Sequence, residues 1–133
     1  MGAPISVELG IIALSGKLND TLAAKQLELQ LPLDITMTRW GDEYYGTLLP
    51  PLGEISGEER EVLEVGEIAY WSPGDALCIF FGPTPASQGD EPRAASPVIP
   101  LGKVAGDWDA LRSFGAKIGA HFSLRKGPVD LEA

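Results

Sequence analysis

Residues 68–97, with the sequence IAYWSPGDALCIFFGPTPASQGDEPRAASP, decide the fold of this chain. Two short apolar and aromatic runs, 65–71 and 76–81, flank a Ser-Pro-Gly-Asp turn at 72–75. Runs of this length, bounded by turn residues, are typical of β-strands. A polar segment, 86–97, follows the second run, and a structureless loop of that length is usually functional or mobile. Its prolines are equally consistent with a segment that only crosses the end of a barrel.

Alternation of apolar and polar residues predicts strands on both sides of this stretch. The first two form a hairpin or one bulged strand that Gly10 interrupts. In the last strand, Ile118, Ala120, Phe122 and Leu124 are expected to face the interior, with His121 outside. The expected strands are 5–9, 11–14, 33–40, 43–49, 65–71, 76–81, 98–104 and 117–124.

One helix of substance is expected at 21–31, where Asn19 and Asp20 can cap the start and Pro32 ends it. A single helical turn is expected at 107–111, with acidic residues at its N-terminal end. The acidic segment 52–63 is expected to be a solvated excursion. The predicted buried face of the first helix includes Leu18, Leu22 and Leu29. Many short strands and few helices predict an all-β barrel or sandwich in a single domain, 1–133.

Composition excludes several classes of function. A net charge of −9 argues against nucleic-acid binding and against anionic membranes, because both need clustered basic residues. No apolar run reaches the roughly 18 residues of a membrane span, and no signal peptide is evident. One Cys and one His, far apart, predict neither a disulfide nor a metal site, and no cofactor motif is present. We therefore expect a soluble, cytoplasmic protein without metal or cofactor.

Several motifs together resemble the signature blocks of a small prokaryotic cyclophilin-like family. They occur in the same order, over residues 33–125, and are WGDEYY (40–45), VGEIAYWSPG (65–74), ALCIFFGPTP (76–85), RAASPV (93–98) and GKV (102–104). The resemblance implies a closed antiparallel barrel of about eight strands, with one short helix and one helical turn. The Phe-His-Arg block of ordinary cyclophilins is absent. An isomerase activity would follow from the resemblance in fold alone.

Rotation about an Xaa-Pro bond needs an apolar pocket and a group that hydrogen-bonds the proline nitrogen. Arg93 is the candidate for that group, and is catalytic only if the protein is an isomerase. Because successive residues of a strand face opposite ways, about half of the aromatic candidates belong to the core. Arg93 can instead pair with Asp90 or Glu91. The ligand-binding candidates are Tyr45, Tyr70, Trp71, Phe80, Phe81, Gln88 and Arg93.

Three functions follow from these residues. The leading hypothesis is a module that binds a small apolar ligand or a proline-containing peptide in an aromatic pocket. The first alternative is a peptidyl-prolyl isomerase with a rearranged site. The second is a self-association or scaffold module that uses an exposed patch of Trp40, Tyr44, Trp71 and Trp108. The expected oligomeric state is a monomer or a weak homodimer. The acidic pairs at 42–43 and 90–91 are interpreted as turn residues, and Cys78 as inert core.

Overall fold

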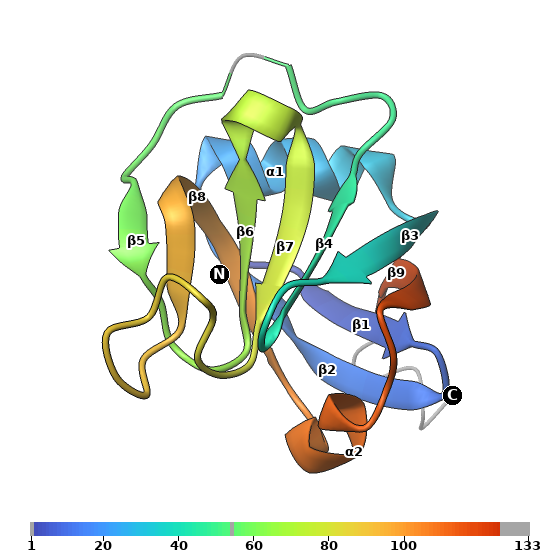
Figure 1. Ribbon diagram of the computed structural model, residues 1–133. Helices are drawn as coiled ribbons and strands as arrows, with labels where there is room; N and C mark the ends of the chain where they lie inside the picture. Colours follow the sequence, from blue (N-terminus) through green and yellow to red (C-terminus); the bar gives the residue numbers. More distant parts are fainter. Residues whose placement is uncertain (1, 54, 126–133) are drawn as a thin grey trace.

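One antiparallel sheet closes on itself to form the body of the protein (Figure 1), in a computed structural model that describes residues 2–53 and 55–125. In this part of the chain the strand order is β2-β1-β9-β3-β4-β7-β6-β8-β5, and a pairing of β2 with β8 closes the ring. The strands are β1 (Pro4–Leu9), β2 (Ile12–Leu18), β3 (Leu33–Arg39), β4 (Glu43–Thr47), β5 (Arg60–Val62), β6 (Glu67–Trp71), β7 (Ala76–Phe80), β8 (Arg93–Ala105) and β9 (Lys117–Leu124). The expected all-β closed barrel is confirmed.

The helices are few, as expected: α1 (Leu22–Gln30), α2 (Trp108–Arg112) and a 3-10 turn at Ser72–Gly74. In the view of Figure 1, α1 lies at the top behind β6 and β7, and α2 at the bottom. No helix in the described ranges is both long and apolar enough to cross a membrane.

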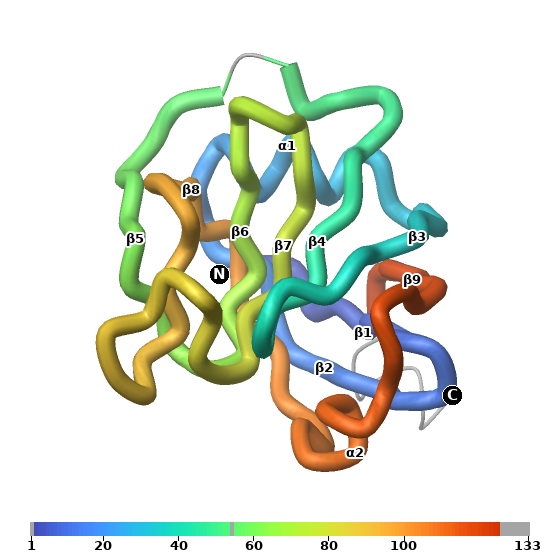
Figure 2. The backbone as a smooth tube through the Cα atoms, in the orientation of Figure 1, coloured from blue at the N-terminus to red at the C-terminus, as the bar shows by residue number. Residues whose placement is uncertain are grey.

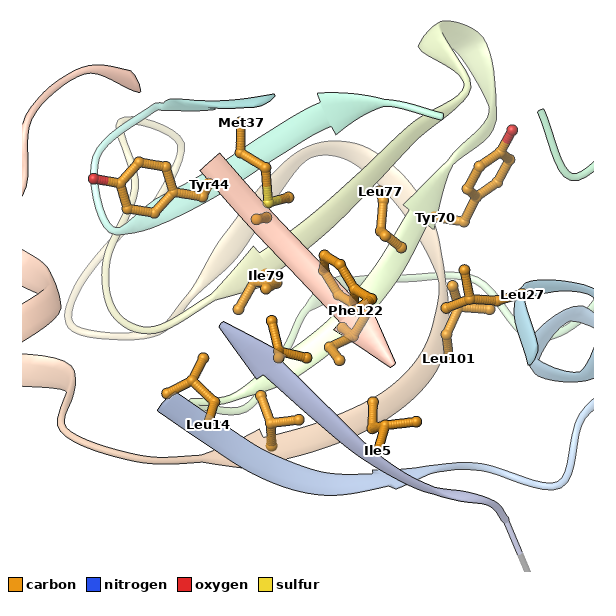
Figure 3. Close-up of a cluster of buried hydrophobic side chains, with 14 of the residues drawn as sticks. Ile5, Leu14, Leu27, Met37, Tyr44, Tyr70, Leu77, Ile79, Leu101 and Phe122 are labelled. Atoms are coloured by element: carbon orange, nitrogen blue, oxygen red, sulfur yellow. The ribbon is translucent and has the colours of Figure 1, made fainter. Parts of the chain in front are cut away.

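The interior of the ring is filled by alternate residues of the strands (Figure 3). Ile5, Met37 and Phe122 are fully buried there, together with Leu77 and Ile79. Burying such large apolar side chains is the main stabilising term of the fold. The two core tyrosines, Tyr44 and Tyr70, direct their hydroxyls away from the cluster. These hydroxyls donate to the Gly115 carbonyl at 2.7 Å and to Asp75 at 2.9 Å, so burial leaves neither unsatisfied.

The first helix presents a different face to the core from the one predicted. Its N-cap is Thr21, whose hydroxyl accepts from the Ala24 N–H at 3.1 Å. The buried side chains are Ala23, Ala24 and Leu27. Leu22 and Leu29 are 78% and 80% exposed, so their predicted burial is wrong. Ala23, Ala24 and Leu27 therefore form the face of the helix that packs on the barrel. Leu18 is buried, but as the last residue of β2.

Two other expectations need correction, one for a single residue and one for a segment. Leu124 was expected to face the interior, but it is 50% exposed because it is the last residue of β9, paired with Ile5 at the edge of the barrel. The other three residues of that face, Ile118, Ala120 and Phe122, are buried as expected. The predicted solvated segment at 52–63 contains the short strand β5, which pairs only with β8.

Strand β8 begins at Arg93, five residues before the predicted start, and this extension creates a second layer. Its later part pairs with β6, from Ile99 to Lys103, whereas its earlier part pairs with β5. The tube in Figure 2 shows this early part and β5 side by side, next to the gold loop that precedes β8. We call residues 60–62 and 93–98 the flap. The flap packs on the outer face of the barrel, in a second apolar cluster of Leu63, Ala69, Ala76, Cys78, Phe80, Ala94 and Val98, with Trp71 against it.

Candidate functional site

A cavity of about 270 Å³ lies between the flap and the outer face of the barrel. Strands β4, β6 and β7 supply one wall, the flap supplies the other, and the turn between β3 and β4 contributes Trp40. The cavity opens to solvent, because Ala95 is exposed and Tyr45 is 37% exposed. The lining residues are Trp40, Glu43, Tyr45, Trp71, Cys78, Ala94, Ala95 and Val98.

Strand alternation explains which side chains reach this cavity. Tyr44 points into the barrel core, so its neighbours Glu43 and Tyr45 lie on the outer face of β4. Cys78 occupies the same outer face on β7, where it pairs with Tyr45 across the two strands. The small side chains of Ala94 and Ala95 keep the flap from filling the space. The result is a pocket with aromatic walls and a single carboxyl.

Glu43 is the unusual residue of the site. Its side chain is 5% exposed, and no ion pair in the described ranges includes it. Burial raises the pKa of its carboxyl from 4.5 to about 8, and a hydrogen bond with the Cys78 thiol offsets this only in part. Burial also raises the pKa of the Cys78 thiol well above its ordinary value, and the Glu43 charge adds to that effect. The pair therefore holds its protons near neutral pH.

Two other polar side chains in the described ranges are buried, and both have structural partners. Glu67 accepts from Arg60 at 2.6 Å and from the Glu64 N–H at 2.8 Å. The Thr84 hydroxyl donates to the Arg93 carbonyl and accepts from the Ala86 N–H. Glu43 instead faces a cavity. A buried carboxyl that has no cation beside it and lines an opening is a candidate for ligand contact.

The turn that carries Trp40 is held in place by backbone geometry and by one arginine. Gly41 has a φ of 62°, and a Cβ there would lie 2.8 Å from Thr84, so only glycine fits. Arg39 donates to the carbonyls of Gly41, Arg112 and Phe114 at 2.7–3.0 Å and pairs with Asp42 at 2.9 Å. The Trp71 indole is fixed as well, because its N–H donates to the Ser96 hydroxyl at 2.6 Å. The backbone that carries Trp40 and the side chain of Trp71 are therefore both held in place.

Arg93 lies at the start of β8 and is not among the residues that line the cavity. Its guanidinium pairs with Glu91 at 2.9 Å and with Glu61 at 3.7 Å. Glu91 also accepts the N–H groups of Gln88 and Gly89, and these bonds, with Arg93, lower its pKa to about 2. The Gln88 side chain is exposed in the loop, outside the cavity. The loop is thus internally organised, and Arg93 takes part in that organisation.

The five aromatic candidates divide between core and cavity. Tyr45 and Trp71 line the cavity, and Phe80 packs beneath it in the apolar cluster of the outer face. Tyr70 and Phe81 belong to the barrel core. Phe81 is stacked between Tyr44 and Trp108, with ring centroids 5.9 and 6.0 Å apart.

Sequence reasoning missed Trp40, Glu43, Cys78 and the three flap residues as members of the site. A signal was available, because strand alternation places Glu43, Tyr45 and Cys78 on outer faces of neighbouring strands. An outer face is normally solvated, however, and nothing in the sequence indicated that the flap covers it. The interpretation of Glu43 as a turn residue rests on the acidic pair 42–43, since such pairs are common in turns.

The remaining candidates give no site of their own. No group of three or more metal-binding side chains occurs in the described residues. His121 lies on the outer face, as expected, with its Nδ1 2.7 Å from Asp34. Tyr44 is fully buried and therefore cannot belong to the exposed patch expected for self-association, whereas Trp40, Trp71 and Trp108 are half-buried.

Comparison with known proteins agrees with this architecture. A family model described as Cyclophilin-like matches residues 3–119. Among solved structures, the chain is similar to a hypothetical protein from Archaeoglobus fulgidus whose structure was determined in solution. The two share 24% sequence identity and a TM-score of 0.74, over 93% of this chain and 95% of the other. No curated protein matches.

Proposed function

The chain belongs to the cyclophilin-like family, and we propose that it is a binding module whose ligand enters the cavity between flap and barrel. The observation that supports this proposal is the apolar cavity, whose lining includes a buried carboxyl that hydrogen-bonds the Cys78 thiol and has no ion-pair partner among the described residues. Desolvating such a group costs free energy, and a fold gains nothing from that cost unless the group meets a ligand.

The size of the cavity limits the ligand. At about 270 Å³ it lies just below the roughly 300–1,000 Å³ of pockets that hold drug-sized molecules. It therefore suits a small molecule, or one side chain of a bound peptide, and excludes a nucleotide-sized cofactor. Walls of Trp40, Tyr45 and Trp71 favour an apolar or aromatic body.

A variant that fills the cavity tests the proposal. Ala95 is exposed and lines the cavity, so Ala95→Trp should block the opening without disturbing the core. Ala13→Trp is the matched control, because Ala13 is an exposed strand residue of β2. We would titrate both variants and the wild type with small probes, including benzyl alcohol and N-acetylproline methyl ester, by NMR. Probe binding should be lost in Ala95→Trp and kept in Ala13→Trp; equal binding by both would contradict the proposal.

Prolyl isomerisation is the enzymatic alternative that the family resemblance suggests. In that reaction a cation would have to reach the proline nitrogen, yet Arg93 is paired with Glu91 and Glu61 and does not line the cavity. We expect no acceleration of Xaa-Pro isomerisation that depends on Arg93. Acceleration by the wild type that disappears in Arg93→Ala would restore the isomerase hypothesis.

A further inference from the structure

The carboxyl of Glu43 determines what chemistry the cavity can complement. An ionised carboxylate in an apolar site is costly unless an opposite charge accompanies it. Of the residues that line the cavity, none is Lys, Arg or His. The missing partner of an ionised Glu43 is therefore a cation that the ligand must bring.

The guanidinium groups of Arg39 and Arg93 already bond to other groups of the protein. Arg39, four residues before Glu43, has its donors on three backbone carbonyls and Asp42. Arg93, at the base of the flap, pairs with Glu91 and Glu61. Neither guanidinium can turn into the cavity without giving up these bonds.

The walls favour an organic cation over a metal ion. Aromatic faces attract ammonium groups, and cages of several aromatic residues recognise methylated ammonium ions. The cavity has three such residues, Trp40, Tyr45 and Trp71. The one polar atom of the Trp71 ring is already bonded to Ser96, so this wall offers apolar ring surface only. A metal ion would need several oxygen or sulfur donors, whereas the lining supplies one carboxyl and one protonated thiol.

Long-range electrostatics point the same way. The chain carries 19 acidic and 10 basic residues, and the resulting net charge of −9 attracts cations and repels anions. A small organic cation would be drawn towards the protein before any contact is made.

Building on the proposed function, we infer that the cavity binds an alkylammonium group, with the Glu43 carboxylate as its counter-ion and Trp40, Tyr45 and Trp71 as its walls. The apolar part of the ligand lies against Ala94, Ala95 and Val98 of the flap. Binding releases the carboxyl proton, because only the ionised form pairs with the cation.

Two probes of equal shape and different charge test this inference. Benzyltrimethylammonium carries the cation, and neopentylbenzene replaces its nitrogen by carbon. At pH 8.5 the wild type should bind the cation about tenfold or more tightly than the neutral isostere. Glu43→Gln should lose that preference, and a circular-dichroism spectrum and cooperative thermal unfolding like those of the wild type show that the variant is folded.

The affinity of the wild type for the cation should rise between pH 6 and 9 and level off, and that of Glu43→Gln should not change. Cys78 faces Glu43 from β7 and stays a thiol, since burial raises its pKa. Tyr45 lies on the same outer face of β4 as Glu43. The charged groups of the flap are Arg60, Glu61 and Arg93, Glu91 lies in the loop before it, and Arg39 and Asp42 flank the turn. All of them remain in Glu43→Gln, so the difference between the two profiles isolates Glu43.

The outcomes separate this inference from the proposed function. Preference for neopentylbenzene in the wild type, or a cation preference that survives in Glu43→Gln, overturns the alkylammonium assignment and leaves the binding module standing. Binding of neither probe, together with no response to the probes of the cavity-filling experiment, overturns both.

Discussion

Glu43 connects the stability of this protein with its proposed activity. Its carboxyl is buried beside Cys78, in a cavity that has no Lys, Arg or His among the described residues that line it. Protonation relieves the cost of burial, and a bound cation would relieve it in a second way. Burial of the ionised carboxylate destabilises the ligand-free protein. A bound cation would remove this cost, so the removal would add to the free energy of binding.

The raised pKa of Glu43 predicts how stability depends on pH. The unfolded carboxyl loses its proton near pH 4.5, whereas the folded one holds it until about pH 8. Between these values the folded state binds more protons, so its stability falls as pH rises, by up to about 1.4 kcal/mol per pH unit, and is constant above pH 8. Glu43→Gln should remove this fall. Urea unfolding of both proteins at pH 5, 7 and 9 gives the free energy of unfolding at each pH. The same pH dependence in both proteins would contradict the raised pKa of Glu43.

Individual side chains of the site were predictable only in part. Alternation along β7 correctly separates Cys78 and Phe80 from Leu77 and Ile79, because a strand fixes the direction of each side chain. It does not say whether an outer face meets water or a second layer. That depends on contacts with β8, far along the chain, and these placed Glu43 in a cavity when its local sequence favoured a turn.

At the level of elements, α1 offers a test of which face packs on the barrel. Leu27 is fully buried and Leu29 is 80% exposed, in the same helix and with the same side chain. Leu27→Ala should cost about 2–5 kcal/mol, through lost burial and the cavity left behind. Leu29→Ala should change stability by less than about 0.5 kcal/mol. Chemical denaturation of the two variants gives both values, and comparable losses would mean that the helix is rotated relative to this description.

The elements themselves were largely predictable, with one informative exception. Apolar runs and alternation located every strand of the ring, because each has one face on the core. The helices were located by capping and stop signals and by acidic residues at a helix start. The early part of β8 was taken for loop, since it contains Pro97 and follows a polar run. Proline is tolerated there because the register between β5 and β8 shifts between Arg60 and Val62, and that irregularity leaves room for a residue without an N–H. The early part of β8 pairs with only the short strand β5, so its sequence does not show the alternation of a strand inside a larger sheet.

At the level of the whole molecule, closure of the barrel depends on the pairing of β2 with β8. Gly16 faces Val104 across this pair, and a Cβ on Gly16 would lie 2.0 Å from the Lys103 carbonyl oxygen. Gly16→Ala should therefore destabilise the protein by more than about 2 kcal/mol, because backbone must move. Gly119→Ala is the control, since its Cβ would meet nothing within 4 Å. Thermal unfolding should show a large drop in Tm for the first variant alone; similar Tm values would contradict closure at this pair.

The central claim is that the ligand site lies on the outside of the barrel, under the flap, and the three tryptophan indole N–H signals test it most directly. Trp40 and Trp71 line the cavity, whereas Trp108 is stacked on Phe81. In ¹⁵N–¹H spectra, assigned with Trp→Phe variants, titration with benzyltrimethylammonium at pH 8.5 should shift the signals of Trp40 and Trp71 and leave that of Trp108 unchanged. A shift confined to Trp108, or no shift of the two cavity signals at saturation, would contradict the account.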